Sequence, residues 1–226
     1  MSGDEIKKKT FREAVLNWYK NNKRDFPWRN TSDPYKIWIS EILLQQTNAD
    51  KAVDPYLKIT KNYPTVFDLV DASIEELKCI FSKIGLFYRA ERIKTVAADI
   101  CRNYDGDFPK AKNELLKLKG IGSYTASAIM CFAYNFPCAV VDTNFIRIIE
   151  RVFGVKSSKC RPRNDQLIWE FADSLVDTEN PKDYNYAVLD FASLICRARN
   201  PRCSICEIQK ICELKIKMDK KLKKEN

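Results

Sequence analysis

The spacing of apolar residues is the feature that most constrains this chain. They recur every three or four positions along most of its 226 residues, and a clean apolar–polar alternation never lasts more than a few positions. Short stretches with Pro, Gly or Asn separate segments of helical length. We therefore predict an all-α fold. The expected helices include residues 73–84, 90–104, 112–119, 124–136, 144–154 and 164–176.

Composition narrows the class of protein. Hydrophobic residues make up 45% and charged residues 31%, and no apolar stretch reaches the roughly 18 residues of a membrane span. The first 15 residues lack an apolar segment after their charges, so we expect a cytoplasmic protein without a secretion signal. The excess of 39 Lys and Arg over 30 Asp and Glu, a net charge of +9, favours a polyanionic partner but equally fits a solvated basic surface.

The absence of histidine limits the chemistry. The chain has no His at all, which excludes Ser-His-Asp triads, Cys-His nucleophile pairs and zinc sites that use His. Any catalysis must therefore use carboxylates, Lys, Tyr or Cys.

One acid stands in an apolar helix. In residues 30–50, Asp33 can cap a helix that has Pro34 in its first position. Apolar residues then surround Glu41, so we expect burial to raise its pKa and make it a candidate general acid. A single Glu in a helix is more often at the surface or paired with Lys or Arg. Gln45 and Gln46 follow, with amides that could read base edges or fill a gap in a base stack.

Two glycines mark a tight connection between helices. Gly120 and Gly122 lie between a helix expected to end at Leu118 and another beginning near Ser123. Glycine permits close backbone approach, and a helix N-terminus presents free N–H groups to phosphate, although the same letters also fit a plain turn. Further on, Asp142 follows an apolar run and begins the next helix. It is either a helix cap or a carboxylate at the mouth of a cleft.

Four cysteines near the C-terminus have the spacing C-x6-C-x2-C-x5-C. Four thiolates in a reducing compartment suit zinc or an iron–sulfur cluster. Zinc ribbons normally have two CxxC pairs and this loop has one, which favours a 4Fe-4S cluster. The loop is also rich in arginine, which suits contact with a DNA backbone. The four cysteines are Cys196, Cys203, Cys206 and Cys212.

Taken in order, the segments DPYKIWISEILLQQT, LKGIGSYTA and VVDTNFIR and the four-cysteine loop resemble the helix-hairpin-helix DNA glycosylases of the endonuclease III superfamily. The resemblance runs from about Trp28 to Cys212. It implies a six-helix domain at residues 29–135 with the hairpin. It also implies a second helical domain from residues 1–28 and 136–226, with a 4Fe-4S cluster in the loop 196–212.

The same resemblance implies roles for individual residues. Asp142 would stabilise a sugar cation, Glu41 would act as the acid, and Tyr124 would line the pocket at the position where endonuclease III has its Schiff-base lysine. A monofunctional enzyme that uses water as its nucleophile is therefore expected. DNA contacts are implied for the residues Gln45, Gln46, Gly120, Ile121, Gly122 and Asn144.

Two branches of this superfamily remain open as interpretations. The segment WISEILLQQT resembles adenine glycosylases of the MutY type. Four other features resemble G·T mismatch thymine glycosylases of the Mig type: the segments YTASAIMCFAYNF and VVDTNFIRIIERVFG, the single tyrosine in IGLFYRAERI, and the chain length. The resemblance therefore favours a base excision repair enzyme, a monomer acting on nucleoid DNA, that removes thymine or uracil opposite guanine. Adenine opposite guanine or oxidised guanine is the alternative substrate. A non-catalytic module that binds duplex DNA is the remote alternative.

Overall fold

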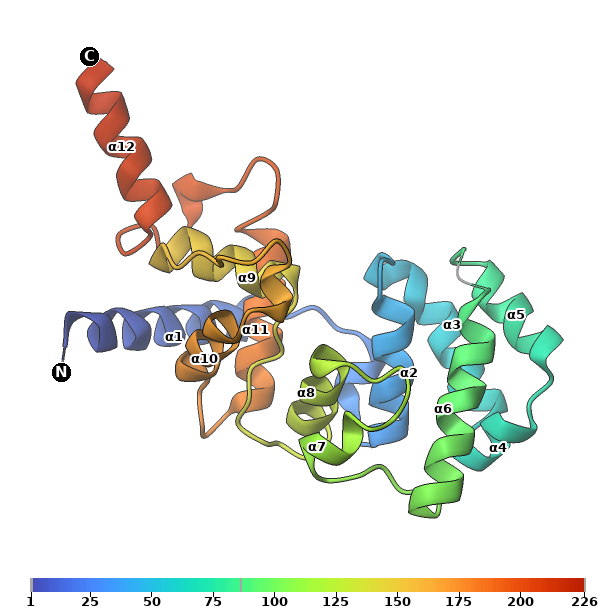
Figure 1. Cartoon of the computed structure of the whole chain (residues 1–226). Coiled ribbons are helices and arrows are strands. Elements are labelled where there is room, and N and C mark those ends of the chain that lie inside the picture. The colour runs from blue at the N-terminus through green and yellow to red at the C-terminus, as the bar shows by residue number, and fades with distance from the viewer. Residues whose placement is uncertain (1, 86, 226) are drawn as a thin grey trace. The chain divides into compact units, whose positions relative to one another are not determined.

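The computed structural model describes residues 2–85 and 87–225 (Figure 1). Every regular element among these residues is helical, and none of them forms a strand. The predicted all-α fold is therefore confirmed. None of the described helices is both long enough and apolar enough to cross a membrane.

The chain forms two compact units. One is Asp25–Tyr134, and the other combines Met1–Arg24 with Asn135–Asn226. The sequence predicts the divisions after residues 28 and 135 instead. We refer to Asp25–Tyr134 as the hairpin unit and to the other as the cysteine-loop unit.

The described part of the hairpin unit has six α-helices longer than one turn, a single-turn helix and a short 3-10 helix. Helix α2 packs against α3 and α8, and α4 and α5 pack against α6. Apolar side chains from all these helices form the unit's core. The elements are η1 Pro27–Asn30, α2 Pro34–Leu44, α3 Ala49–Asn62, α4 Val66–Asp71, α5 Ile74–Ser82, α6 Arg89–Tyr104, α7 Lys112–Leu115 and α8 Ser123–Phe132.

Helix α2 begins as its sequence indicates. The Asp33 side chain accepts hydrogen bonds from the N–H groups of Tyr35 and Lys36, and Pro34 occupies the first helical position, where no N–H is needed. The helix is buried on almost every side, because eight of the nine residues from Tyr35 to Leu43 are buried and most of these are apolar. Such a helix lies inside its unit, not on the surface.

The connection before α8 differs from the predicted one. Helix α7 ends at Leu115, not at Leu118. The next residues form turns in which Leu118 N–H donates to Leu115 O and Ile121 N–H donates to Leu118 O. These bonds span three residues instead of the helix's four, so the chain tightens before Gly120 and then enters α8.

In the cysteine-loop unit, α1 packs along α11, and α11 also packs against α9. Arg24, just after α1, donates from Nε to the fully buried Asp190 of α11 at 2.7 Å. Helix α9 continues into a π-helical turn, η2. The elements are α1 Gly3–Asn22, α9 Thr143–Ile148, η2 Ile149–Phe153, η3 Pro162–Asn164, α10 Gln166–Leu175, α11 Pro181–Leu194, η4 Cys203–Ile205 and α12 Glu213–Glu225.

Candidate active site and DNA-binding elements

Glu41 lies in the third turn of α2 and is only 3% exposed. A carboxylate can be held there only with polar partners or in its protonated form, because burial disfavours a charge. Tyr124, the second residue of α8, is half-buried on the helix that packs against α2. Both predicted catalytic residues of the hairpin unit thus belong to neighbouring helices.

The predicted amide pair forms the turn that ends α2. Gln45 is the capping residue. Gln46 is exposed, and its φ of +58° lies in the left-handed region that residues other than glycine rarely adopt. The turn is closed by Thr47 N–H, which donates to Leu44 O at 3.3 Å. Backbone strain of this kind is found at functional sites more often than elsewhere.

The hairpin turn requires glycine at Gly120. Its φ is +109°, and a Cβ there would lie 2.9 Å from Nε of Arg92. Arg92, exposed on α6, donates from its guanidinium to Gly120 O. Gly122 is different, since its φ is −94° and a Cβ there would meet nothing within 4 Å.

The N-terminus of α8 has no side-chain cap. Gly122 has no side chain to accept from the first N–H groups of the helix. Gly122 and Ser123 are exposed at this helix start, where the helix dipole favours an anion. Ile121 differs from the two glycines, because it is buried and its N–H already donates to Leu118 O at 3.0 Å within the turn.

Asp142 lies at the N-terminus of α9 in the cysteine-loop unit, where its sequence context indicates. Its Oδ1 accepts from Phe145 N–H at 2.8 Å, and its Oδ2 accepts from Asn144 Nδ2 at 2.5 Å. Burial raises the pKa of Asp142 above its ordinary value, although these hydrogen bonds and Arg147 act in the opposite direction. The carboxylate is thus fixed in place by its own helix and poorly solvated.

A chain of hydrogen bonds leads from Asp142 to the cysteine loop. Asn144 donates to Asp142, and Arg147 Nη2 donates to Asn144 Oδ1 at 2.9 Å. Arg147 Nε also donates to the backbone oxygen of Cys196 at 2.9 Å, and Nη2 to that of Ala192 at 2.8 Å. The orientation of the acid is therefore tied to the first cysteine of the loop.

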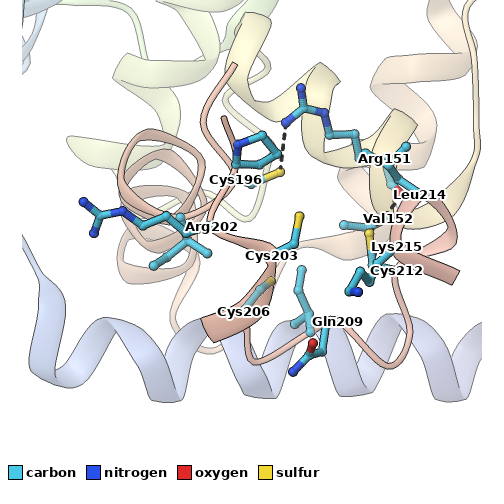
Figure 2. A pocket seen from close by; sticks show the side chains of 13 residues that line it. Arg151, Val152, Cys196, Arg202, Cys203, Cys206, Gln209, Cys212, Leu214 and Lys215 are labelled. Atoms are coloured by element: carbon cyan, nitrogen blue, oxygen red, sulfur yellow. Dashed lines mark hydrogen bonds between the residues drawn. The ribbon is translucent and has the colours of Figure 1, made fainter. Parts of the chain in front are cut away.

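The four predicted cysteines line one pocket of the cysteine-loop unit (Figure 2). None of the four forms a disulfide, and all are partly exposed. Burial, with a smaller contribution from the three neighbouring cysteines, raises the pKa of the Cys206 thiol to about 11. Arg151 Nη1 approaches Cys196 Sγ at 3.6 Å, and Cys212 Sγ donates to Arg151 O at 3.2 Å.

No three His, Cys, Asp or Glu side chains in the described part of the chain are grouped so that they could hold a single metal ion. Four cysteine thiols around one pocket, beside a guanidinium, are a donor set that either zinc or an iron–sulfur cluster can use.

Several residues in or beside these elements had no role predicted from the sequence. Arg147 and Arg151 occupy the helical segment after Asp142, and their spacing of four places them on one face toward the loop. Phe87 and Tyr88 are more than half exposed, at 58% and 54%, just before α6. The sequence signal for Phe87 and Tyr88 was two adjacent aromatic residues in a basic chain.

A family model described as HhH-GPD superfamily base excision DNA repair protein matches residues 39–173. The chain belongs to this family. A thymine/uracil-DNA glycosylase of Pyrobaculum aerophilum is 40% identical, and the alignment covers 88% of each chain. A thymine/uracil-DNA glycosylase of Methanothermobacter thermautotrophicus is 37% identical over 91% of this chain and 93% of that one. An adenine DNA glycosylase of Buchnera aphidicola is 32% identical over 90% of this chain but 58% of its own length.

Solved structures agree with the family. A thermostable thymine-DNA glycosylase superimposes with a TM-score of 0.90 at 36% identity, covering 96% of this chain and 100% of that one. Endonuclease III in a non-covalent DNA complex shares the fold, with a TM-score of 0.77 at 22% identity. The predicted family, the helical fold and an enzyme of base excision repair are confirmed.

Proposed function

We propose that this protein is a monofunctional DNA glycosylase that hydrolytically removes thymine or uracil opposite guanine from duplex DNA. The observation that carries the proposal is Asp142, a poorly solvated carboxylate fixed by the N-terminus of α9, by Asn144 and, through it, by Arg147. The thymine/uracil glycosylases named above, which match nearly their full length, support the choice of base.

The reaction begins with extrusion of the target nucleotide, which costs least for a mispaired base. As the N-glycosidic bond breaks, positive charge develops on the sugar, and the Asp142 carboxylate stabilises it electrostatically and helps to position water. Glu41 supplies a hydrogen bond or proton to the leaving base or to the water. Its burial in α2 supports this role.

Tyr124 supports the proposal that the enzyme is monofunctional and uses water as its nucleophile. An amine at this position would attack the sugar and cleave the strand, whereas a phenol leaves water as the nucleophile. Tyr124→Lys is expected to give a covalent complex that borohydride traps, if the position lies beside the sugar. Lys119, a nearby exposed residue, provides the control: Lys119→Gln in the Tyr124→Lys background should still be trapped.

The proposed DNA contacts are of two kinds, to phosphate and to bases. The hairpin with the half-buried Gly120 and the exposed Gly122, together with the N-terminus of α8, would bind phosphate through backbone N–H groups, without sequence preference. Gln45 or Gln46 would fill the vacated stack. The exposed ring of Tyr88 would stack on the bases that extrusion leaves unstacked. Asn144 acts by orienting Asp142.

The thiols of Cys196, Cys203, Cys206 and Cys212 would hold a 4Fe-4S cluster. Their placement around one pocket and the cationic Arg151 beside them support this, because a guanidinium offsets the negative charge of a thiolate-bound cluster. The loop would then be cross-linked, with Cys196 O kept in place for Arg147. The purified protein should be yellow-brown with iron and sulfide. Colourless protein with one zinc would contradict the cluster.

The experiment that tests the function is single-turnover base release from otherwise identical duplexes with G·T, G·U, A·G, or A opposite oxidised guanine. Each is analysed with and without alkali. Strand cleavage of G·T and G·U only after alkali is the expected result. Release of adenine would favour the second candidate, which the 32% identity to an adenine glycosylase supports. Silence on all four, with tight duplex binding, would favour the non-catalytic module.

The enzyme would act as a monomer on nucleoid DNA in the cytoplasm. A basic chain with net charge +9 is attracted to DNA of any sequence. Sedimentation of the protein with a mismatched duplex should give a one-to-one complex.

A further inference from the structure

Arg89 is a buried cation in the hairpin unit with no role assigned so far. It is the first residue of α6, and only 3% of it is exposed. Its Nη1 donates to Ile42 O in the last turn of α2. The carbonyl groups of a last helical turn lack partners within their own helix, so this guanidinium fixes where α2 ends.

The same side chain also contacts the segment on its other side. Arg89 Nη2 lies 3.5 Å from the hydroxyl of Tyr88, and the guanidinium carbon lies 5.6 Å from the centre of the Tyr88 ring. Tyr88 itself is 54% exposed. One buried residue therefore touches both the end of α2 and an aromatic ring at the surface.

The turn at the end of α2 needs such support. Gln46 is held at φ of +58° directly after the Gln45 cap, two residues beyond Leu44, where α2 ends. A residue held in this left-handed region persists only where its surroundings enforce it. Arg89, by binding Ile42 O, anchors the chain just before this turn from the interior of the unit.

We propose that Arg89 is a positioning residue that makes Gln46 and Tyr88 act together on the distorted base pair. This rests on the proposed function, in which both side chains enter the opened stack. Because one guanidinium contacts both supports, a shift of the α2 turn is transmitted to the Tyr88 ring, and the reverse. The two side chains should therefore bind an opened site cooperatively, and the cooperativity should depend on Arg89.

The test is a double-mutant cycle in DNA binding. The probe is a duplex with guanine opposite a tetrahydrofuran abasic analogue, which no glycosylase can cleave. Dissociation constants are measured for wild type, Gln46→Ala, Tyr88→Ala and the double variant. In a cooperative pair, either single change already removes much of what the other contributes. If the two losses of affinity were independent, the double variant would lose the product of the two single losses. We expect the double variant to bind about tenfold better than that product predicts, and we call this factor the overlap.

The same cycle is then repeated in an Arg89→Lys background. There the losses from Gln46→Ala and Tyr88→Ala should simply multiply, because an ammonium cannot contact Ile42 O and Tyr88 at once as the forked guanidinium does. The overlap of about tenfold should therefore vanish.

Arg12 offers a matched control in the cysteine-loop unit. Its Nε donates to Leu175 O, the last residue of α10, at 3.0 Å, so it too is an arginine that binds a helix end. Arg12→Lys should lower the thermal unfolding midpoint as Arg89→Lys does, yet leave the overlap between Gln46→Ala and Tyr88→Ala at about tenfold. A purely structural role for Arg89 would make the two variants behave alike.

If Arg89→Lys does not fold, Tyr88→Phe gives a second route, because it keeps the ring beside the guanidinium but removes the hydroxyl that faces Arg89. The overlap with Gln46→Ala should then fall in part. An overlap that stays at about tenfold in Arg89→Lys, or in Tyr88→Phe, overturns the inference alone. Wild type that binds the abasic duplex no better than a perfect one contradicts the proposed function and the inference together.

Discussion

Two helix N-termini in this molecule are built in opposite ways. In the cysteine-loop unit, α9 begins with Asp142, whose side chain accepts from Phe145 N–H and so occupies the end of its own helix. In the hairpin unit, α8 begins with Gly122, which has no side chain to do so. The first arrangement fixes an acid, and the second gives the helix start no carboxylate of its own.

The difference teaches how one structural element serves two tasks. A helix N-terminus favours negative charge wherever it occurs. Where the protein supplies the charge, as at Asp142, the carboxylate gains a defined orientation for chemistry. Where it supplies none, as at Gly122, the proposed partner is a DNA phosphate.

The largest effect is expected for Asp142→Asn. Asparagine is as good a helix cap as aspartate, so the fold should persist, but the negative charge that stabilises the sugar cation is lost. Excision in single turnover should fall by about 10³-fold or more, while duplex binding stays within a few-fold of wild type. Asp165→Asn is the control, since Asp165 caps α10 in the same unit. Normal turnover by Asp142→Asn would refute the proposed active site.

A smaller loss is expected for Arg147→Met. It keeps much of the side chain's length but removes the donors to Asn144 Oδ1 and Cys196 O, so Asp142 loses its orientation and keeps its charge. Excision should fall by roughly 10- to 100-fold, the range for misplacing a reacting group by about 1 Å. Single-turnover rates at saturating protein measure it.

Arg151→Met distinguishes misorientation of Asp142 from disruption of the cysteine loop. Arg151 donates to Arg197 O and approaches Cys196 Sγ, whereas Arg147 is the residue that donates to Asn144. If the cysteine loop holds the proposed cluster, Arg151→Met should reduce iron content more than it reduces excision per cluster. If Arg147→Met and Arg151→Met lower excision per cluster equally, the chain through Asn144 does not orient the acid.

Gly122→Asp would give α8 the kind of start that α9 has. The new carboxylate can accept from the first N–H groups, so the free energy of unfolding should rise by about a few tenths of a kcal/mol. The same carboxylate takes the place of a phosphate, and duplex affinity should fall by about tenfold for every sequence. Thermal unfolding and binding isotherms at fixed salt measure the two.

Gly122→Ala is the control for that change. A Cβ at Gly122 meets nothing within 4 Å, so it adds bulk without charge, and affinity should stay near wild type. Equal losses for both substitutions would mean that space, not the open helix end, decides binding.

Much of this arrangement could be predicted from the sequence because the signals are local. Asp33 before Pro34 fixes the start of α2, and Asp142 after an apolar run fixes that of α9. Helix ends were harder. Leu116 and Leu118 have good helical propensity, yet α7 stops at Leu115, because the turn into Gly120 needs the tighter bonds.

The contacts that support the site could not be predicted from the sequence. Arg147 and Cys196 are far apart in the chain, and nothing in either segment indicates that a guanidinium meets that carbonyl. Arg89 has the sequence context of a surface arginine but is buried. Such contacts depend on how helices pack, which periodicity alone does not determine.

The smallest expected effect is on the pH dependence of stability, to which Asp142 and Asp165 should contribute with opposite signs. Burial raises the pKa of Asp142 above 3.8, so its contribution to folding is present at low pH and is lost as pH rises through the folded-state pKa. Asp165 is opposite: the hydrogen bond from Ser157 lowers its pKa, so its contribution is present at neutral pH and is lost as pH falls.

Asp142→Asn should therefore unfold at a slightly higher temperature than wild type at pH 7, and Asp165→Asn at a lower one. Both differences should shrink as pH falls toward the ordinary aspartate value of 3.8, because Asp142 is then protonated in the folded protein, whereas Asp165 becomes protonated in the unfolded chain. Melting curves from pH 4 to 8 decide it. A lower midpoint for Asp142→Asn at pH 7 would mean that the bonds from Phe145 and Asn144 outweigh the burial of the charge, and that the acid is held for stability as well as for chemistry.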